Sequence, residues 1–455
     1  MQKLSMKERI LPILGNKDVN LKREIVAGVT TFLTMAYIIA VNPQILSQAG
    51  MPIGALVTAT CLTAAFGCIL MGVFANLPFA LASGMGLNAF FAFSVVLGKG
   101  ISWEMALTAV FVEGIIFIIL SISKAREAVV NAIPMNMKHA VTAGIGMFIA
   151  FVGFVGSGLV VKDDSTLIAM GKFTPTVIIA LIGVIIIAVL DKKKVKGSIL
   201  FGILTSTLLA WGYALISPEK AAELAIFLPE GIFKFESIAP IAGKLDFTIL
   251  TNTETIWTFI SVVCTFLFVD FFDTVGTLVG VTSRANMLDE EGKVPNAGRA
   301  LLVDAVATTV GAALGVSTVT TYVESSTGVA AGGRTGYTAI VTGILFFFAM
   351  FFSPIFIAIP GCATAPALIY VGYLMIGAVK NIDFDNITEG VPAFLTISGM
   401  VLTYSIGDGL TIGILSYVII NVVYNLFFAK KEEKTKVSIV MIVLAILFLI
   451  KIFFL

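Results

Sequence analysis

The chain has 455 residues, of which 58% are apolar and only 13% are charged, and its mean hydropathy is +1.03. Soluble domains are about a quarter charged, so this composition excludes a soluble enzyme and indicates a helical membrane protein with many spans. The apolar runs are continuous rather than alternating, which argues against a membrane β-barrel. The net charge of +1 argues against nucleic acid as a partner, and the single histidine, His139, argues against a histidine-ligated metal site.

Apolar stretches long enough to cross a bilayer follow one another along the chain, each crossing needing roughly 20 residues. In the first half we predict spans near residues 25–46, 55–74, 79–97, 103–122, 139–156, 176–190 and 198–216. In the second half they lie near 256–281, 300–314, 325–331, 338–352, 363–379, 391–405 and 410–428. The expected fold is all-α and polytopic, with about fourteen transmembrane segments, and a last apolar run, 437–455, either spans the membrane or lies at its interface.

Basic residues predict the orientation of the chain in the cell membrane. The polar N-terminal segment carries six Lys or Arg residues before residue 24, and the other basic loops are 124–138, 192–196, 284–299 and 430–436. In a fourteen-span path all of these loops fall on the same side of the bilayer. Because short cytoplasmic loops are enriched in Lys and Arg, we expect the N-terminus to be cytoplasmic.

Short matches between the two halves predict an internal repeat. Ile133-Pro134 precedes the fifth span and Ile359-Pro360 the twelfth, while a Gly-Ile-Leu triplet occurs at Gly202 in the seventh span and at Gly413 in the fourteenth. Each half then has seven spans, an odd number, so the second half must enter the membrane with opposite topology. Such inverted repeats are typical of secondary transporters.

Two segments at corresponding places break the helix pattern. The third span opens on residues 79–88 and the tenth on residues 316–328, and both are rich in Gly, Ser or Thr. We predict a short extended piece followed by a half-helix in each. Non-helical backbone at membrane depth survives only inside protein or beside a cavity, so the pair points to a substrate site near the midplane.

Ionisable residues within spans are costly and therefore mark candidate functional residues. Glu324 lies where the extended piece of the tenth span turns into its half-helix, and its carboxylate could accept hydrogen bonds from a ligand or cap the half-helix. Asp270 and Asp273 are three residues apart on one face of the eighth span. Asp270 is a candidate for substrate contact and Asp273 for proton coupling, because burial and like charge could keep one of the two carboxyls protonated. The alternative is a structural pair bonded to backbone amides of the broken spans.

Asn88 follows the break of the third span, and its amide offers both a donor and an acceptor to the edge of a heterocycle. The alternative is an interhelical hydrogen bond. Phe90 and Phe91 come next and are candidates to face a flat ligand, although a place in the core or against lipid is the simpler interpretation.

With these residues the chain resembles the AzgA-like purine permeases (adenine, guanine and hypoxanthine) of the nucleobase–ascorbate transporter, or nucleobase–cation symporter, superfamily. The resemblance runs from about residue 11 to residue 429. It rests on residues 28–37 (GVTTFLTMAY), 42–43 (NP), 84–91 (GMGLNAFF), 270–277 (DFFDTVGT) and 320–328 (TTYVESSTG).

The resemblance implies two intertwined seven-span repeats that form a core domain and a gate domain. The core would comprise residues 1–125 and 250–352, the gate 126–249 and 353–430, and residues 431–455 would form a C-terminal hydrophobic segment. Substrate would lie between the third and tenth spans with the eighth alongside.

By motif position, the resemblance assigns substrate contact to Asn88, Asp270 and Glu324, with the backbone of Tyr322 and Val323 beside the purine. The substrate-binding set also includes Ser83, and Ser325 and Thr274 are weaker candidates. Related uracil permeases carry a histidine at the position of Thr274, so the candidates for proton coupling are Asp270, Asp273 and Glu324.

The sequence thus predicts a secondary transporter that imports a purine base by proton symport, with hypoxanthine or guanine as the expected substrate and adenine as a further candidate. It would need no cofactor beyond protons and no metal, its partners would be the nucleobase and the lipid bilayer, and a homodimer stays open. One alternative is an anion transporter of the sulfate-permease type, which the acidic site disfavours because carboxylates repel a divalent anion. A membrane-embedded hydrolase is a further alternative, but the sequence offers no catalytic triad.

Overall fold

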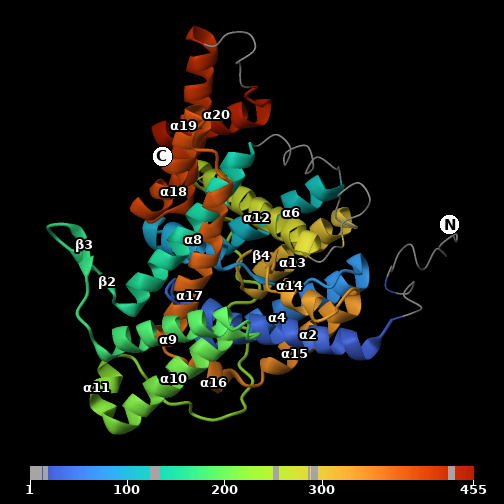
Figure 1. The fold of residues 1–455 in the computed structure, drawn as a ribbon, viewed down its shortest axis with the longest axis vertical. Helices are drawn as coiled ribbons and strands as arrows, with labels where there is room; N and C mark the ends of the chain where they lie inside the picture. The colour runs from blue at the N-terminus through green and yellow to red at the C-terminus, as the bar shows by residue number, and fades with distance from the viewer. Residues whose placement is uncertain are drawn as a thin grey trace.

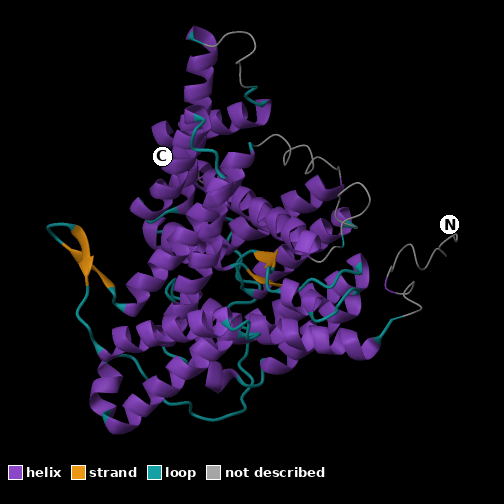
Figure 2. Cartoon of the chain, in the orientation of Figure 1, coloured by secondary structure: helices purple, strands orange, loops and turns teal. Residues whose placement is uncertain are grey.

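The computed structural model describes residues 13, 19–122, 134–248, 256–284, 287, 296–428 and 436–454. Most of the described chain is helical (Figures 1 and 2). In the first half the elements are α2 (Leu21–Met35), α3 (Ile38–Ser47), α4 (Ile53–Leu70), the π-helix η2 (Met71–Ala75), β1 (Leu81–Ser83), α5 (Met85–Ala89), the π-helix η3 (Phe90–Leu97), α6 (Trp103–Ile122), α8 (Met135–Ser157), β2 (Val160–Asp163), β3 (Leu167–Met170), α9 (Pro175–Lys192), α10 (Ser198–Ile216) and α11 (Pro218–Glu223).

The second half begins with the longest helix of the described chain, which contains the predicted eighth span. Its elements are α12 (Ile256–Arg284), α13 (Ala297–Leu314), β4 (Val319–Thr321), α14 (Ser325–Ala330), α15 (Gly336–Ala349), α16 (Ser353–Ile357), α17 (Gly361–Ile376), the 3₁₀-helix η5 (Gly377–Asn381), α18 (Ile387–Leu402), α19 (Ile406–Phe427) and α20 (Ile439–Phe454).

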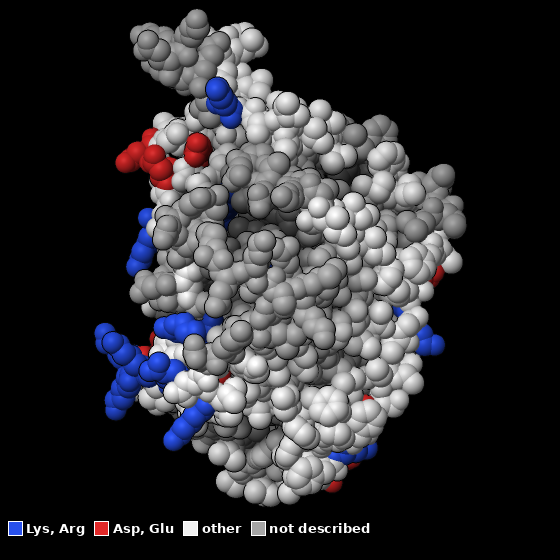
Figure 3. All heavy atoms as spheres, turned by 90° about the vertical axis from the view of Figure 1, so that its right-hand side faces the viewer, with Lys and Arg blue, Asp and Glu red and all other residues white. Residues whose placement is uncertain are grey.

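The described helices confirm a multi-pass, all-α membrane protein. Nine helical stretches of the described chain are long and apolar enough to cross a bilayer, and shorter apolar helices include Met85–Leu97, Gly336–Ala349 and Ile387–Leu402. The count of fourteen crossings stays a prediction. Figure 3 shows one face of the molecule, on which most of the described Lys, Arg, Asp and Glu side chains lie along the left and right edges.

Helix ends follow local sequence signals. The side chain of Asn20 accepts from the backbone N–H of Arg23 and caps α2, and Thr174 caps α9 ahead of Pro175 at the first helical position. At the other end, α8 stops at Gly158, whose φ of +80° is a left-handed conformation that glycine adopts without steric cost.

The helices pack in two sets. In one, α2 packs against α14 and α15, α4 against α3 and α15, and α6 against α12 and α13. In the other, α8 packs against α17 and α18, α9 against α10 and α17, and α18 against α19. In Figure 1, α2, α4 and α15 lie together in the lower half, α18 and α19 lie near the top, α8 runs through the middle, and α9 and α10 lie at the lower left. We refer to these as the core set and the gate set of helices; the expected division into a core domain and a gate domain stays a prediction.

Both predicted broken spans have the expected form. β1 is followed by α5 and η3, and β4 is followed by α14, so each span is an extended piece joined to a helix. The two strands pair antiparallel, with Leu81 opposite Thr321 and Ser83 opposite Val319. This small sheet lies at the centre of the molecule, enclosed by helices (Figure 2).

Candidate functional site

The β1–β4 crossing is closed by hydrogen bonds beyond the strands. Gly84 N donates to Thr318 O, and Tyr322 N donates to Ala80 O, each at 3.0 Å. A side chain also ties the two broken spans together, because Ala80 N donates to Ser325 Oγ at 3.0 Å. The turn into each half-helix is thereby fixed relative to the other.

The two outer edges of this sheet are satisfied by side chains from helices. On β1, Cys68 of α4 accepts from Leu81 N at 3.2 Å and donates its thiol to Leu81 O at 3.3 Å. On β4, Thr308 of α13 accepts from Val319 N at 3.2 Å and donates to Val319 O at 2.9 Å. An unpaired backbone group at membrane depth is costly, so these two side chains allow a two-stranded sheet to exist there.

Glu324 immediately precedes α14, and its side chain does not cap that helix. Instead Oε1 accepts a hydrogen bond of 2.7 Å from the hydroxyl of Tyr37, which lies between α2 and α3. Glu324 is half-buried and the neighbouring Val323 is 51% exposed. Surface therefore remains at this position for contact with a ligand.

Asn88 is completely buried in α5, and its Oδ1 accepts from the hydroxyl of Ser83 at 2.7 Å. Ser83 O in turn accepts from the hydroxyl of Tyr322 at 2.5 Å, so the Tyr322 side chain links β1 to the start of the tenth-span half-helix. The Nδ2 atom of Asn88 is buried and has no hydrogen-bond partner within the described part of the chain. An unused amide donor thus lies next to the crossing.

Asp270 belongs to a second, fully buried polar group beside β4. The hydroxyl oxygen of Thr274 lies 3.3 Å from Asp270 Oδ1, 3.0 Å from Asp304 Oδ2 and 3.0 Å from Thr320 Oγ1. α12, α13 and β4 meet at this hydroxyl. Asp273 lies in α12, and its side chain is outside the described residues.

The remaining candidates are placed within the structure as follows. Ser325 and Thr274 are fully buried and make the bonds given above. Phe90 and Phe91 are buried in the helical core, and the ring of Phe90 packs edge-on against Phe266 with centroids 4.9 Å apart. Neither phenylalanine has exposed surface for a ligand in this conformation.

Sequence reasoning missed Tyr37 and did not place Asp304 among the candidates for substrate contact or proton coupling. Tyr37 is part of the motif 28–37, but its contact spans 287 residues of sequence, which no local pattern shows. Asp304 is an acidic residue within a predicted span, and that signal alone could have placed it among the candidates.

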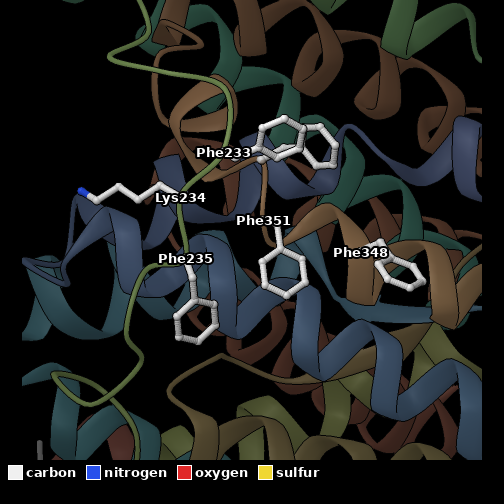
Figure 4. Close-up of a pocket in the computed structure, with 6 residues that line it drawn as sticks. Phe233, Lys234, Phe235, Phe348 and Phe351 are labelled. Atoms are coloured by element: carbon white, nitrogen blue, oxygen red, sulfur yellow. The ribbon is translucent and has the colours of Figure 1, made fainter.

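A cavity of about 740 Å³ lies elsewhere, and it is lined by Phe233, Lys234, Phe235, Phe348, Phe351 and Phe352. The phenylalanine rings line the hollow while the Lys234 side chain points away from them (Figure 4). None of its lining residues belongs to the β1–β4 crossing or to the acidic cluster around Thr274. An aromatic hollow without buried polar groups does not match the predicted site.

Residues 22–412 match the sequence profile of a family described as the permease family. The chain is 46% identical to a putative permease of Methanocaldococcus jannaschii over 89% of this chain and 90% of that one. It is 41% identical to the guanine/hypoxanthine permease PbuO of Bacillus subtilis (97% and 99%) and 38% identical to the adenine permease AdeP of Escherichia coli (99% and 96%).

Among solved structures, the transmembrane domain of the cyanobacterial bicarbonate transporter BicA is similar with a TM-score of 0.63. The structural match covers 88% of this chain and 96% of the BicA domain, and the two sequences are 15% identical over it. At this identity the similarity shows the fold alone. The fold predicted from the sequence is thus that of a known class of membrane transporters.

Proposed function

Because this chain belongs to the permease family, we propose that it is a secondary active transporter that imports purine nucleobases together with protons. The observation that carries the proposal is a half-buried carboxylate at the crossing of two broken spans, in a chain whose full-length relatives are named for guanine, hypoxanthine and adenine. A membrane transporter rather than an enzyme follows from the family itself.

The crossing holds one acceptor, on the half-buried Glu324, and one donor, on Asn88, which is buried in this conformation and would meet a ligand only after the crossing opens. The carboxylate of Glu324 accepts hydrogen bonds, while Asn88, whose Oδ1 is occupied by Ser83, has its amide donor left over. A purine edge carries an N–H group next to a ring nitrogen or carbonyl acceptor, so it complements this pair. Both an oxopurine and adenine satisfy the pattern, with the donor and acceptor positions exchanged.

The cluster around Thr274 supports proton coupling. A threonine hydroxyl carries one hydrogen, yet here its oxygen lies within hydrogen-bond distance of two carboxylates, Asp270 and Asp304. If one of the two carboxyls is protonated, it can donate to the threonine oxygen while the threonine hydroxyl donates to the other carboxylate. Each contact then has its own hydrogen, and the repulsion between two like charges in a buried site is removed. We assign the coupled proton to this pair, with Glu324 as the carboxylate that meets the substrate.

Alternating access would move the core set of helices against the gate set. The half-helix of the third span lies on that boundary: a Cβ on Gly86 would be 2.6 Å from Ile145 Cγ2 of α8. Further along, the ring of Phe93 in η3 packs edge-on against Tyr404, which lies between α18 and α19, with centroids 5.7 Å apart. Sliding at these contacts would expose the crossing to one side of the membrane or the other.

The rival function is anion transport, since the bicarbonate transporter shares the fold. Three acidic side chains, Glu324, Asp270 and Asp304, lie at the crossing or in the buried cluster beside it. Ionised carboxylates in a poorly solvated site repel an anion, so these residues disfavour an anionic cargo.

The test is uptake of labelled hypoxanthine, guanine and adenine into proteoliposomes, with and without an inward proton gradient and with sulfate or bicarbonate as competitor. We expect gradient-stimulated uptake of at least one base, insensitive to either anion. Uptake of labelled bicarbonate or sulfate with none of any base, from folded protein, would refute the proposal.

A further inference from the structure

The first span reaches the candidate site at the junction of α2 and α3. α2 ends at Met35 and α3 begins at Ile38, and Tyr37 between them keeps helical dihedral angles and is only 1% exposed. From there its hydroxyl donates to Glu324 Oε1 at 2.7 Å. We propose that Tyr37 is a positioning residue that fixes the substrate-binding orientation of the Glu324 carboxylate, an inference that rests on the proposed function.

The docking of α14 on the first span does not depend on this bond. Gly328 of α14 lies directly on α2, because a Cβ there would be 2.0 Å from Thr31 Oγ1 and 2.8 Å from Ala27 O. Thr34 Oγ1 lies 3.0 Å from Thr327 Oγ1, one turn before Tyr37. Ala27, Thr31, Thr34 and Tyr37 recur every three or four residues, so they share one face of the first span.

A second anchor holds the segment that follows α14. Glu24 is 4% exposed, and its carboxylate accepts from Arg334 N at 3.0 Å and from the Thr338 hydroxyl at 2.5 Å. The guanidinium of Arg334 donates to Val329 O at 2.6 Å, near the end of α14. With α14 held at several points by other contacts, the hydroxyl of Tyr37 acts on the carboxylate rather than on the helix.

A hydroxyl suits this role chemically. It donates to an ionised carboxylate and can accept from a protonated one, so the same pair persists in either form of Glu324. The bond engages one of two carboxylate oxygens, which leaves the second oxygen for a substrate N–H group. Without the hydroxyl, the carboxylate could rotate about its side-chain torsions, and binding would have to fix it again.

Tyr37→Phe keeps the ring and removes only the hydroxyl, and the readout is the KM and maximal rate of purine uptake in proteoliposomes. A hydrogen bond to a charged group contributes about 1.5–3 kcal/mol, so we expect KM to rise roughly tenfold or more. The maximal rate and the melting temperature should change little. Thr34→Val is the matched control, because it removes a bond between the same two elements without touching the carboxylate.

A double-mutant cycle with Glu324→Gln, measured by equilibrium binding of hypoxanthine at millimolar concentrations, isolates the pair. We expect Tyr37→Phe to cost less than about threefold in affinity when it is combined with Glu324→Gln, and Thr34→Val to act equally with and without Glu324→Gln. An unchanged KM for Tyr37→Phe, or the same loss of affinity whether or not the carboxylate is present, would overturn the positioning role. Absence of purine uptake by the unaltered protein would instead overturn the proposed function.

Discussion

At the scale of single residues, one polar atom of Glu324 and one of Asn88 are hydrogen-bonded within the protein. The other oxygen of Glu324 is then left as an acceptor, and the amide nitrogen of Asn88 as a donor. Tyr37 takes one oxygen of Glu324, and Ser83 takes the oxygen of Asn88. Buried polar groups in such networks are fixed by their partners, so under the proposed function each partner would contribute to recognition without touching the substrate.

Removing the Ser83 hydroxyl tests this arrangement at Asn88. Ser83→Ala leaves the amide oxygen without its donor, and the amide can then turn and present the wrong group to the substrate. A neutral hydrogen bond contributes about 1 kcal/mol, so we expect KM for purine uptake to rise about fivefold. The measurement is concentration-dependent uptake; Ser83→Thr, which keeps a hydroxyl, should remain nearer the unaltered value, and equal KM values for all three proteins would contradict the role.

Replacing one member of the buried carboxyl pair tests the proton assignment. An asparagine at position 304 accepts a hydrogen bond from Thr274 but holds no transferable proton. For Asp304→Asn we therefore expect stimulation of uptake by a proton gradient to disappear, while exchange of labelled for unlabelled base continues.

Asp164→Asn is the control, because Asp164 lies on the β2–β3 hairpin with its side chain 96% exposed. Undiminished gradient stimulation in Asp304→Asn would show that the proton travels elsewhere.

At the scale of elements, the candidate site depends on two short buried strands whose outer edges are hydrogen-bonded by side chains of helices. The broken spans were predictable from Gly, Ser and Thr in the runs 79–88 and 316–328, since these residues interrupt otherwise apolar spans. The sequence did not predict the strand register, in which Ala82 lies opposite Thr320. It also did not predict the hydrogen bonds that Cys68 and Thr308 make to the outer edges of the two strands. They join segments that only the assembled fold brings together.

The same difference between local sequence signals and tertiary contacts explains which candidate site residues could be predicted. Glu324, Asp270 and Asn88 are polar groups within apolar or broken spans, and their cost there marks them individually. Tyr37 is ordinary by composition, and its proposed role depends on a tertiary contact with Glu324. Asp304 is marked by its charge, but its link to Asp270 runs through Thr274, thirty residues earlier in the chain.

The edge bond of β4 is testable through Thr308. Thr308→Val conserves the side-chain shape and leaves the N–H and C=O of Val319 without their partner inside the protein. A buried unsatisfied polar group costs about 1–3 kcal/mol, so the melting temperature should fall by several degrees and uptake should drop with it.

Thr308→Ser restores the hydroxyl and should restore most of the stability, as followed by thermal unfolding in detergent. A valine variant as stable and active as the unaltered protein would mean that the sheet edge needs no side-chain partner.

At the scale of the whole molecule, the proposed mechanism requires the core and gate sets of helices to move against each other. Phe93 and Tyr404 are in contact across this boundary, and the four native cysteines are buried or half-buried. In the double variant Phe93→Cys and Tyr404→Cys, a short thiol-reactive cross-linker should abolish uptake and leave purine binding measurable.

Reduction of a cleavable cross-linker should restore uptake, and each single variant, treated identically, should keep it. Full uptake by the cross-linked protein would contradict movement at this contact.

The central claim is that purine recognition depends on the Glu324 carboxylate, and Glu324→Gln tests it most directly. Glu113→Gln is the matched control: Glu113 is a fully buried carboxylate of α6 that accepts from Thr318 at 2.9 Å, and an amide oxygen can accept the same bond. We expect Glu324→Gln to weaken equilibrium binding of hypoxanthine about a hundredfold, the worth of a strong charge-assisted bond, and Glu113→Gln to leave it within a fewfold. Unchanged affinity in folded Glu324→Gln protein would contradict the account.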